Sequence, residues 1–386
     1  MNRPLLMHEV GSLGKPPWRV KPFSAGRVDA EDVDDARAWG RRLDVPDYEQ
    51  LVELLERGEW GNEDKLRIKR WSSVYALRFF ESVGLDVIYD GEQQRSEMYA
   101  WTVAHATGFE QRGSVRSFDN KYYTKSAVVD RVGIREAYHD DEFSFLKSST
   151  GSELKVPVTG AYTVGAWSFD EHYSRGVDLS LPLDERRRLN ADARREMIVD
   201  IARTVIRPCL ESLIALGAGW IQLDEPAAST VPDELDLVVE SFNASVEGLE
   251  AYFSTHLCFS DYELFFPAIE DMHGCRQYAV GFANYDTTEL GLSEDSRAGY
   301  SIIKRFRDLS YEPALGVGVI DIHTDFVEPP ELVRDRILYA VDVFGDPARV
   351  HVTPDCGLRT RSWEVAYRKL ESMVAGTEMA EKALGI

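Results

Sequence analysis

Short apolar runs and longer amphipathic segments alternate along most of the chain. The apolar runs predict eight strands, at residues 5–10, 85–92, 156–162, 219–226, 250–259, 276–284, 314–323 and 349–356. Between them, apolar residues recur at three- and four-residue steps, which predicts helices at residues 63–84, 183–217, 329–344 and 362–384. Eight strands alternating with helices indicate an α/β fold, the (β/α)8 or TIM barrel. A doubly wound sheet stays open as the alternative, because alternation alone does not show closure.

One segment departs from this rhythm. Residues 109–150 alternate polar and apolar positions and carry turn signals, which predicts a β-hairpin excursion between strands two and three of the barrel. No internal repeat or linker interrupts the pattern. We therefore expect residues 1–386 to form a single catalytic barrel domain that carries this insertion.

Charge and cysteine content narrow the class of protein. The 386 residues include 44 Lys and Arg against 66 Asp and Glu, a net charge of −22, which argues against a nucleic-acid-binding surface. The chain has no signal-peptide core and no apolar run near the roughly 20 residues of a membrane span. We expect a cytoplasmic protein with neither a nucleic acid nor a membrane as partner. Four cysteines in so long a chain indicate free thiols or metal ligands rather than a disulfide framework.

Ionisable and ligand-type residues end most of the predicted strands. In an α/β barrel the carboxyl ends of all strands converge on one face, where active sites are built. The residues at these ends are Glu92, Asp224, Glu225, His256, Cys258, Asn284, Asp321, His323, Asp355 and Cys356. A single one could be a loop residue that caps the next helix. The joint pattern predicts a reactive site on this face.

His256 and Cys258 raise the question of a metal. They lie two residues apart on a strand, so their side chains point to the same face, and Cys356 ends another strand. One imidazole and two thiolates suit Zn²⁺ with a fourth position open for substrate. The alternative is that Cys258 is a small core residue, the role that we assign to Cys209 and Cys275.

Several motifs together resemble a known family. The stretches "EVGSL", "DGEQQRSEMY", "IQLDEPA", "THLCFSDY", "GVIDIHT" and "PDCGLRTR" are similar to the catalytic barrel of cobalamin-independent methionine synthase and occur in that family's order. The full-length family has two barrels. This chain has room for the catalytic one alone, so it resembles a short, single-barrel branch.

The resemblance implies a role for each matching residue. It assigns His256, Cys258 and Cys356 to zinc, and Glu92 and Asp224 to the amino group of homocysteine. It further places three residues around the substrates: Ser12 at the substrate carboxylate, His323 as the catalytic histidine near methyl transfer, and Trp167 against the folate pterin. The alternative for Glu92 and Asp224 is an ion pair with an arginine such as Arg95.

Two positions depart from the family pattern. Asn284 stands where the family has a fourth zinc ligand, a Glu, so the ion keeps three protein ligands or recruits a neighbour such as Asp286. Thr230 stands where the long enzyme has a folate-contacting Glu. The thiol-activating half of the site matches well, and the departure at Thr230 favours a methylated corrinoid over methyl-tetrahydrofolate as donor.

These residues predict a zinc-dependent methyltransferase that activates a thiol as a zinc thiolate and converts homocysteine to methionine. A thiol with a pKa of about 8.5 is mostly protonated at pH 7, and coordination to Zn²⁺ deprotonates it. Two alternatives remain open: a zinc alkyltransferase for another thiol, of the coenzyme M epoxyalkane type, and a non-enzymatic zinc-binding or thiol-sensing barrel. Carboxylates at residues 92 and 224 suit an ammonium better than a sulfonate.

Overall fold

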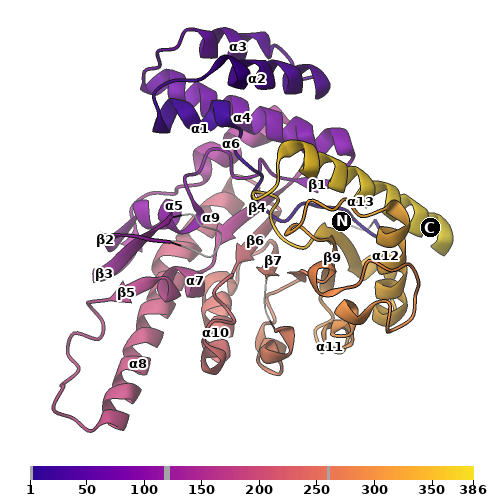
Figure 1. Cartoon of the computed structure of the whole chain (residues 1–386). Coiled ribbons are helices and arrows are strands. Elements are labelled where there is room, and N and C mark those ends of the chain that lie inside the picture. The colour runs from indigo at the N-terminus through magenta and orange to yellow at the C-terminus, as the bar shows by residue number, and fades with distance from the viewer. Residues whose placement is uncertain (1–2, 117–121, 259–260) are drawn as a thin grey trace.

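A parallel sheet forms the centre of the molecule. The computed structural model describes residues 3–116, 122–258 and 261–386. Within them seven strands pair in the order β1-β4-β6-β7-β8-β9-β10 (Figure 1). Their bounds are Val87–Ile88 (β1), Glu153–Thr159 (β4), Trp220–Asp224 (β6), Tyr252–Leu257 (β7), Gln277–Val280 (β8), Ala314–Ile320 (β9) and Val350–Pro354 (β10). Each overlaps one of the predicted runs, so the α/β class and the positions of these seven strands along the chain are confirmed.

The first predicted strand, residues 5–10, forms only two isolated β-bridges in the described structure. Met7 bridges in parallel to Val352 of β10, and His8 bridges in parallel to Val87 of β1. The segment therefore touches both edge strands of the sheet. Leu5 has a φ of 52°, outside the extended region, so the extended segment begins only after this residue.

Thirteen α-helices surround the sheet in the described residues. Figure 1 shows α1, α2 and α3 gathered over α4 at one side of the molecule, and α12 beside α13, which also contacts α4. The helix bounds are Pro17–Ser24 (α1), Ala30–Arg42 (α2), Glu49–Glu56 (α3), Asn62–Val83 (α4), Met98–Ala104 (α5), Asp140–Ser149 (α6), Ala161–Ala166 (α7), Leu183–Ile201 (α8), Arg207–Ala215 (α9), Leu235–Val246 (α10), Ile303–Arg307 (α11), Pro330–Phe344 (α12) and Trp363–Leu384 (α13). No helix in this part of the chain has the length and apolarity to cross a bilayer.

The long helix predicted at residues 183–217 is divided in the middle. A π-helical turn, Ala202–Ile206, separates α8 from α9. Pro208 lies just after this turn, where it removes a backbone donor and crowds the preceding carbonyl groups. The period of apolar residues predicts the helix correctly but does not predict the wider turn.

A second, smaller sheet extends from the main one. β2 (Ala106–Arg116) and β3 (Tyr122–Ile134) pair antiparallel, and β5 (Ser168–Asp170) adds in parallel to β3. The prediction of a hairpin over the whole of residues 109–150 is wrong at its end, where α6 occupies Asp140–Ser149. Three acidic residues in the first turn of α6 favour a helix start, because they complement the helix dipole.

Candidate metal and thiol site

Three side chains from two strand ends lie together. The ligand atoms of His256, Cys258 and Cys356 are all within 4.8 Å of one another. His256 Nε2 is 3.3 Å from the Cys356 sulfur, and Nδ1 is 3.0 Å from the carbonyl oxygen of Ala279. Because a carbonyl oxygen can only accept, Nδ1 carries the proton and Nε2 faces the thiols. One imidazole, oriented by a backbone carbonyl, and two thiols fit the donor set of a zinc ion.

The proximity of these residues shows how strongly the sheet curls. His256 belongs to β7 and Cys356 follows β10, three places away in the strand order. Neighbouring strands are about 4.8 Å apart, so a flat sheet would separate the two strands by roughly 14 Å. The observed contact of 3.3 Å requires the carboxyl ends of the strands to converge.

The two sulfurs differ in acidity. A hydrogen bond from Cys258 holds the pKa of the Cys356 thiol well below its ordinary range, with support from His256 and against the effect of burial. The same hydrogen bond and burial raise the pKa of the Cys258 thiol. Burial alone would lower the pKa of His256, but the charge and hydrogen bond of Cys356, the charge of Asp224 and the hydrogen bond to Ala279 together raise it. The lowered pKa favours the thiolate form of Cys356, and thiolate is the form in which cysteine binds a metal ion.

Asp355 holds the loop that carries Cys356. Its carboxylate accepts hydrogen bonds from the backbone N–H groups of residues 282–284, at distances from 2.7 to 2.9 Å. Burial raises the pKa of Asp355 to about 7, against the effect of these hydrogen bonds. A Cβ on Gly318 would lie 2.2 Å from Asp355 Oδ1, so only glycine leaves room for this side chain. Asp355 therefore joins the ends of β8, β9 and β10 and places Cys356.

The predicted fourth metal ligand is not found among the carboxylates grouped with the other three in the described residues. Asn284 follows β8, and its backbone N–H donates to Asp355. Asp286 is already engaged, because its buried carboxylate forms ion pairs with Arg297 at 2.9 Å and Arg336 at 3.0 Å. No Asp or Glu of the described residues joins the three metal-ligand candidates. Both arginines contact Oδ2 of Asp286, while Oδ1 is buried without a hydrogen-bond partner, so Asp286 as a fourth ligand stays a prediction.

The first loop of the chain brings Ser12 beside the metal-ligand loop. A Cβ on Gly357 would lie 2.5 Å from Ser12 Oγ, so glycine directly after Cys356 permits this approach. The loop is also tied to the "DGEQQR" segment, because Leu13 N–H donates to the carbonyl oxygen of Gly91 at 3.0 Å. Glu92 has a φ of 61°, a strained left-handed conformation that clusters at functional sites. Ser12 and Glu92 thus lie in loops that contact each other beside Cys356.

Arg95 does not pair primarily with the predicted substrate carboxylates. Its Nη2 and Nε donate to Glu142 at 2.6 and 3.0 Å, and its Nη1 donates to the carbonyl oxygen of Pro157 at 2.7 Å. Glu92 is the more distant partner, at 3.6 Å. Asp224 has no arginine partner in the described part of the chain. An arginine salt bridge therefore accounts for Glu92 only in part and for Asp224 not at all.

The adjacent acids Asp224 and Glu225 have different surroundings. Asp224 lies opposite His256 in the β6–β7 pair, and its Oδ1 accepts from Gln222 Nε2 at 2.7 Å. Burial raises the pKa of Asp224 to about 7; the charge of His256 opposes this and that of Glu92 adds to it. Glu225 accepts from two backbone N–H groups at the start of α7, at 3.1 and 2.8 Å. Asp224 therefore faces the metal side of the sheet, and Glu225 caps a helix.

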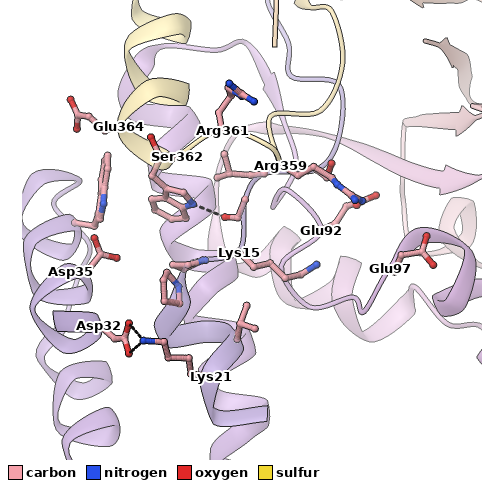
Figure 2. A pocket seen from close by; sticks show the side chains of 18 of the residues that line it. Lys15, Lys21, Asp32, Asp35, Glu92, Glu97, Arg359, Arg361, Ser362 and Glu364 are labelled. Carbon is pink, nitrogen blue, oxygen red and sulfur yellow. Dashed lines mark hydrogen bonds and ion pairs between the residues drawn. The ribbon is translucent and has the colours of Figure 1, made fainter. Parts of the chain in front are cut away.

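An open cavity of about 1100 Å³ adjoins these loops. Ser12 and Glu92 line it together with Lys15, Tyr123 and Arg359. Figure 2 shows the side chains of Lys15, Glu92 and Arg359 directed into the same region. The Arg359 guanidinium lies 5.4 Å from the ring centroid of Tyr123, which links the metal-ligand loop to β3. A cavity of this size suits a ligand larger than an amino acid.

His323 and Asp321 form a pair after β9. His323 Nδ1 donates to Asp321 Oδ1 at 2.8 Å. Burial alone would raise the pKa of Asp321, but hydrogen bonds from the side chain and backbone of His323 lower it. The carboxylate thus fixes the orientation of the imidazole, as in many proton-transfer sites.

The two predicted donor-side positions, Trp167 and Thr230, make contacts of their own. The Trp167 ring is edge-on to Tyr99 with centroids 6.1 Å apart, and its carbonyl oxygen accepts from Lys125 at 2.7 Å. Trp167 is not among the residues that line the cavity of Figure 2. Thr230 Oγ1 donates to the carbonyl oxygen of Ala227 at 2.7 Å, a turn contact.

The other two cysteines are buried in the core. Cys209 lies in α9, and the Cys275 thiol donates to the carbonyl oxygen of Gln277 at 3.1 Å. Burial raises the pKa of each thiol to about 12. Neither belongs to the metal-ligand group, in agreement with a packing role.

Residues 45–379 match the catalytic domain of the cobalamin-independent synthases. The methionine synthase of Thermoplasma acidophilum is 40% identical over 96% of each chain. The chain belongs to the cobalamin-independent methionine synthase family. The methionine synthase of Thermococcus kodakarensis is 34% identical over 87% of this chain and 90% of that protein. The structure of a B12-independent methionine synthase from Shewanella sp. W3-18-1 has the same fold, with a TM-score of 0.74, 21% identity and 99% of each chain covered. The resemblance deduced from the motifs is thus confirmed.

The structure also reveals polar residues that the sequence patterns did not single out. Glu142 is the buried partner of Arg95, and Lys155 lies buried within β4. Glu9 is buried beside Lys155, with 4.0 Å between Oε1 and Nζ. A charged residue inside or next to an apolar run, as at residues 9 and 155, is the signal that could have identified two of them.

Proposed function

We propose that this protein is a zinc-dependent methyltransferase that forms methionine from homocysteine. The convergence of His256, Cys258 and Cys356 in a family of methionine synthases is the observation that carries the proposal. Zn²⁺ held by these residues would lower the pKa of a substrate thiol and supply a nucleophilic sulfur at neutral pH.

The neighbouring side chains supply the remaining contacts of an amino-acid substrate. Asp224 and Glu92 are the partners of the ammonium group, and Ser12 is the partner of the carboxylate. The sulfur forms a bond to the methyl carbon, the donor keeps the electron pair of the bond that breaks, and the thiol proton is lost. His323, oriented by Asp321, is the group that handles a proton during this transfer.

The methyl donor is a methylated corrinoid or a methyl-tetrahydrofolate. The absence of a carboxylate at Thr230, whose hydroxyl is engaged in a turn, favours the corrinoid. The cavity beside Ser12 and Glu92 is the entry side for the donor. Trp167 remains the candidate aromatic contact for a pterin.

We infer that the fold is a closed eight-stranded barrel over the whole chain, with β2 and β3 as the excursion between its second and third strands. The parallel bridges of Met7 and His8 to β10 and β1 support closure, since they connect the two edges of the sheet. Closure would explain how strand ends three places apart share one ligand group.

The test is turnover. Zinc-loaded protein is incubated with homocysteine and, in separate reactions, with methylcobalamin, methyl-tetrahydrofolate or its triglutamate, and methionine is measured by mass spectrometry. Methionine formation with at least one donor is expected. Stoichiometric zinc without methionine from any of these donors would favour a zinc-binding or thiol-sensing role instead.

A further inference from the structure

A buried ammonium group lies at the centre of the sheet, below the metal side. Lys155 on β4 is fully buried, and its Nζ donates to Gln222 Oε1 at 2.6 Å and to the carbonyl oxygens of Glu9 and Val10 at 2.5 and 3.2 Å. Gln222 Nε2 in turn donates to Val10 O and to Asp224 Oδ1. Lysine can only donate, so it fixes the orientation of the Gln222 amide and through it the carboxylate of Asp224.

These contacts use every proton of Lys155. An ammonium group has three N–H donors, and Gln222, Glu9 O and Val10 O accept one each. His8 Nδ1 is 3.2 Å from Nζ, but it is 2.7 Å from the carbonyl oxygen of Glu9 and donates its own proton there. No proton of Lys155 is left for the side chain of Glu9.

The Glu9 carboxylate is therefore buried without a hydrogen-bond donor. Glu9 is 1% exposed, and neither Oε1 nor Oε2 has a hydrogen-bond partner in the described structure. Lys155 Nζ is 4.0 Å from Oε1, beyond hydrogen-bond distance. A buried carboxylate of this kind is costly unless a donor reaches it.

The surroundings of Glu9 indicate which hydrogen-bond donor could reach its carboxylate. The carbonyl oxygen of its neighbour Val10 and the carboxylate of Asp224 both accept from the Gln222 amide, so the backbone next to Glu9 lies beside the Asp224 carboxylate. Burial raises the pKa of Glu9 to about 7; the charge of Lys155 opposes this, and the charges of Asp224, Glu92 and Asp90 add to it. Glu9 is thus electrostatically coupled to both carboxylates assigned to the substrate ammonium.

We propose that Glu9 is a third carboxylate of the ammonium site, which binds the amino group of the thiol substrate together with Asp224 and Glu92. Lys155 is a positioning residue: it holds the backbone of Glu9 and, through Gln222, orients Asp224. A primary ammonium has three N–H donors, one for each of three carboxylates. This inference rests on the proposed amino-acid thiol substrate and assigns it a specificity-determining residue.

The test compares two ligands that differ only in the amino group. Calorimetry measures the affinity of zinc-loaded protein for homocysteine and for 4-mercaptobutanoate, which lacks the ammonium group. The proteins compared are wild type, Glu9→Gln and the control Glu153→Gln, which makes the same acid-to-amide change at an exposed position of β4. Glu9→Gln is expected to weaken homocysteine binding at least about tenfold, the effect of losing a charged hydrogen-bond partner, and to leave 4-mercaptobutanoate binding unchanged. The control should change neither.

Each other outcome contradicts a separate statement. A Glu9→Gln protein that binds homocysteine as well as wild type, or loses affinity for both ligands equally, overturns the role of Glu9. A wild type that binds both ligands equally well overturns the amino-acid substrate itself. If Glu9→Gln fails to fold, the test uses Glu9→Asp, which keeps the charge but withdraws it by one methylene. This variant must then lose affinity for homocysteine and keep its affinity for 4-mercaptobutanoate. A Glu9→Asp protein that binds both ligands with wild-type affinity refutes the proposal.

Discussion

Replacing Glu142 by Gln tests the buried pair that anchors the loop of Glu92. Glu142 and Arg95 are each 3% exposed, and the carboxylate accepts from Arg95 Nη2 and Nε at 2.6 and 3.0 Å and from Tyr89 Oη at 2.8 Å. Glutamine has nearly the same shape, but it has one acceptor oxygen and presents an NH2 group to the remaining donors. The substitution leaves the guanidinium of Arg95 buried beside a neutral side chain.

The expected loss of stability is large. Removing one partner of a buried ion pair costs about 3–5 kcal/mol. The pair of Arg95 with Glu92 at 3.6 Å and the hydrogen bond to Pro157 survive, so we expect the lower end, about 3 kcal/mol. The control is Asp192→Asn in the pair with Arg188, where both side chains are 64% exposed and the cost should stay below about 0.5 kcal/mol.

The effect should also depend on pH. Burial alone would raise the pKa of Glu142, but Arg95 and His139 together outweigh it and hold the pKa well below its ordinary value. A carboxyl whose pKa is depressed by folding stabilises fully above its unfolded pKa, about 4.3, and loses this contribution as the pH falls toward the folded value. Urea unfolding at pH 7 and below pH 4 gives the free energies of unfolding of wild type and Glu142→Gln. The difference between these two free energies should therefore shrink in acid. A difference under 1 kcal/mol at pH 7, or one that grows in acid, would refute the reasoning.

Three further predictions follow from the site. When the protein is purified from zinc-containing medium, mass spectrometry should find about one Zn²⁺ per chain. Cys258→Ala and Cys356→Ala should lose the zinc, and the core variants Cys209→Ala and Cys275→Ala should keep it. The reverse pattern contradicts the ligand assignment. Asp224→Asn should weaken homocysteine binding by roughly 100-fold in calorimetry and leave the zinc content unchanged. The reason is that Gln222 still donates to the amide oxygen, so the amide NH2 group faces the substrate ammonium. A variant with wild-type affinity for homocysteine would remove the support for an amino-acid thiol. Methylcobalamin should give faster methionine formation than methyl-tetrahydrofolate, and Trp167→Ala should slow a folate reaction more than a corrinoid one; turnover with the folate triglutamate and none with methylcobalamin contradicts this.

The parts of the fold that follow local rules could be predicted from the sequence. β6 and β9 are apolar runs with buried residues throughout most of their length, and α13 combines apolar periodicity with the capping residue Ser362, whose Oγ accepts from Val365 N–H. Errors arose where a local backbone feature overrides the pattern, as at Leu5 with its positive φ and at α6, where alternation of polar and apolar residues concealed a helix.

The candidate site divides in the same way. His256, Cys258 and Cys356 could be grouped from sequence, because parallel strands bring their carboxyl ends to one face. The partners of Arg95 and Lys155 could not, since they lie 47 and 67 positions away along the chain in Glu142 and Gln222 and depend on which loops meet. The engagement of Asp286 by two arginines is likewise visible only in three dimensions.

The central claim is that His256, Cys258 and Cys356 hold the zinc that makes a homocysteine thiol reactive. Its most direct test is the rate of methionine formation by protein stripped of metal with a chelator, measured with the best donor before and after one equivalent of Zn²⁺ is restored. We predict no methionine from the stripped protein, recovery on addition of Zn²⁺, and no recovery in Cys356→Ala. Stripped protein that forms methionine at the rate of the zinc-restored protein would contradict the account.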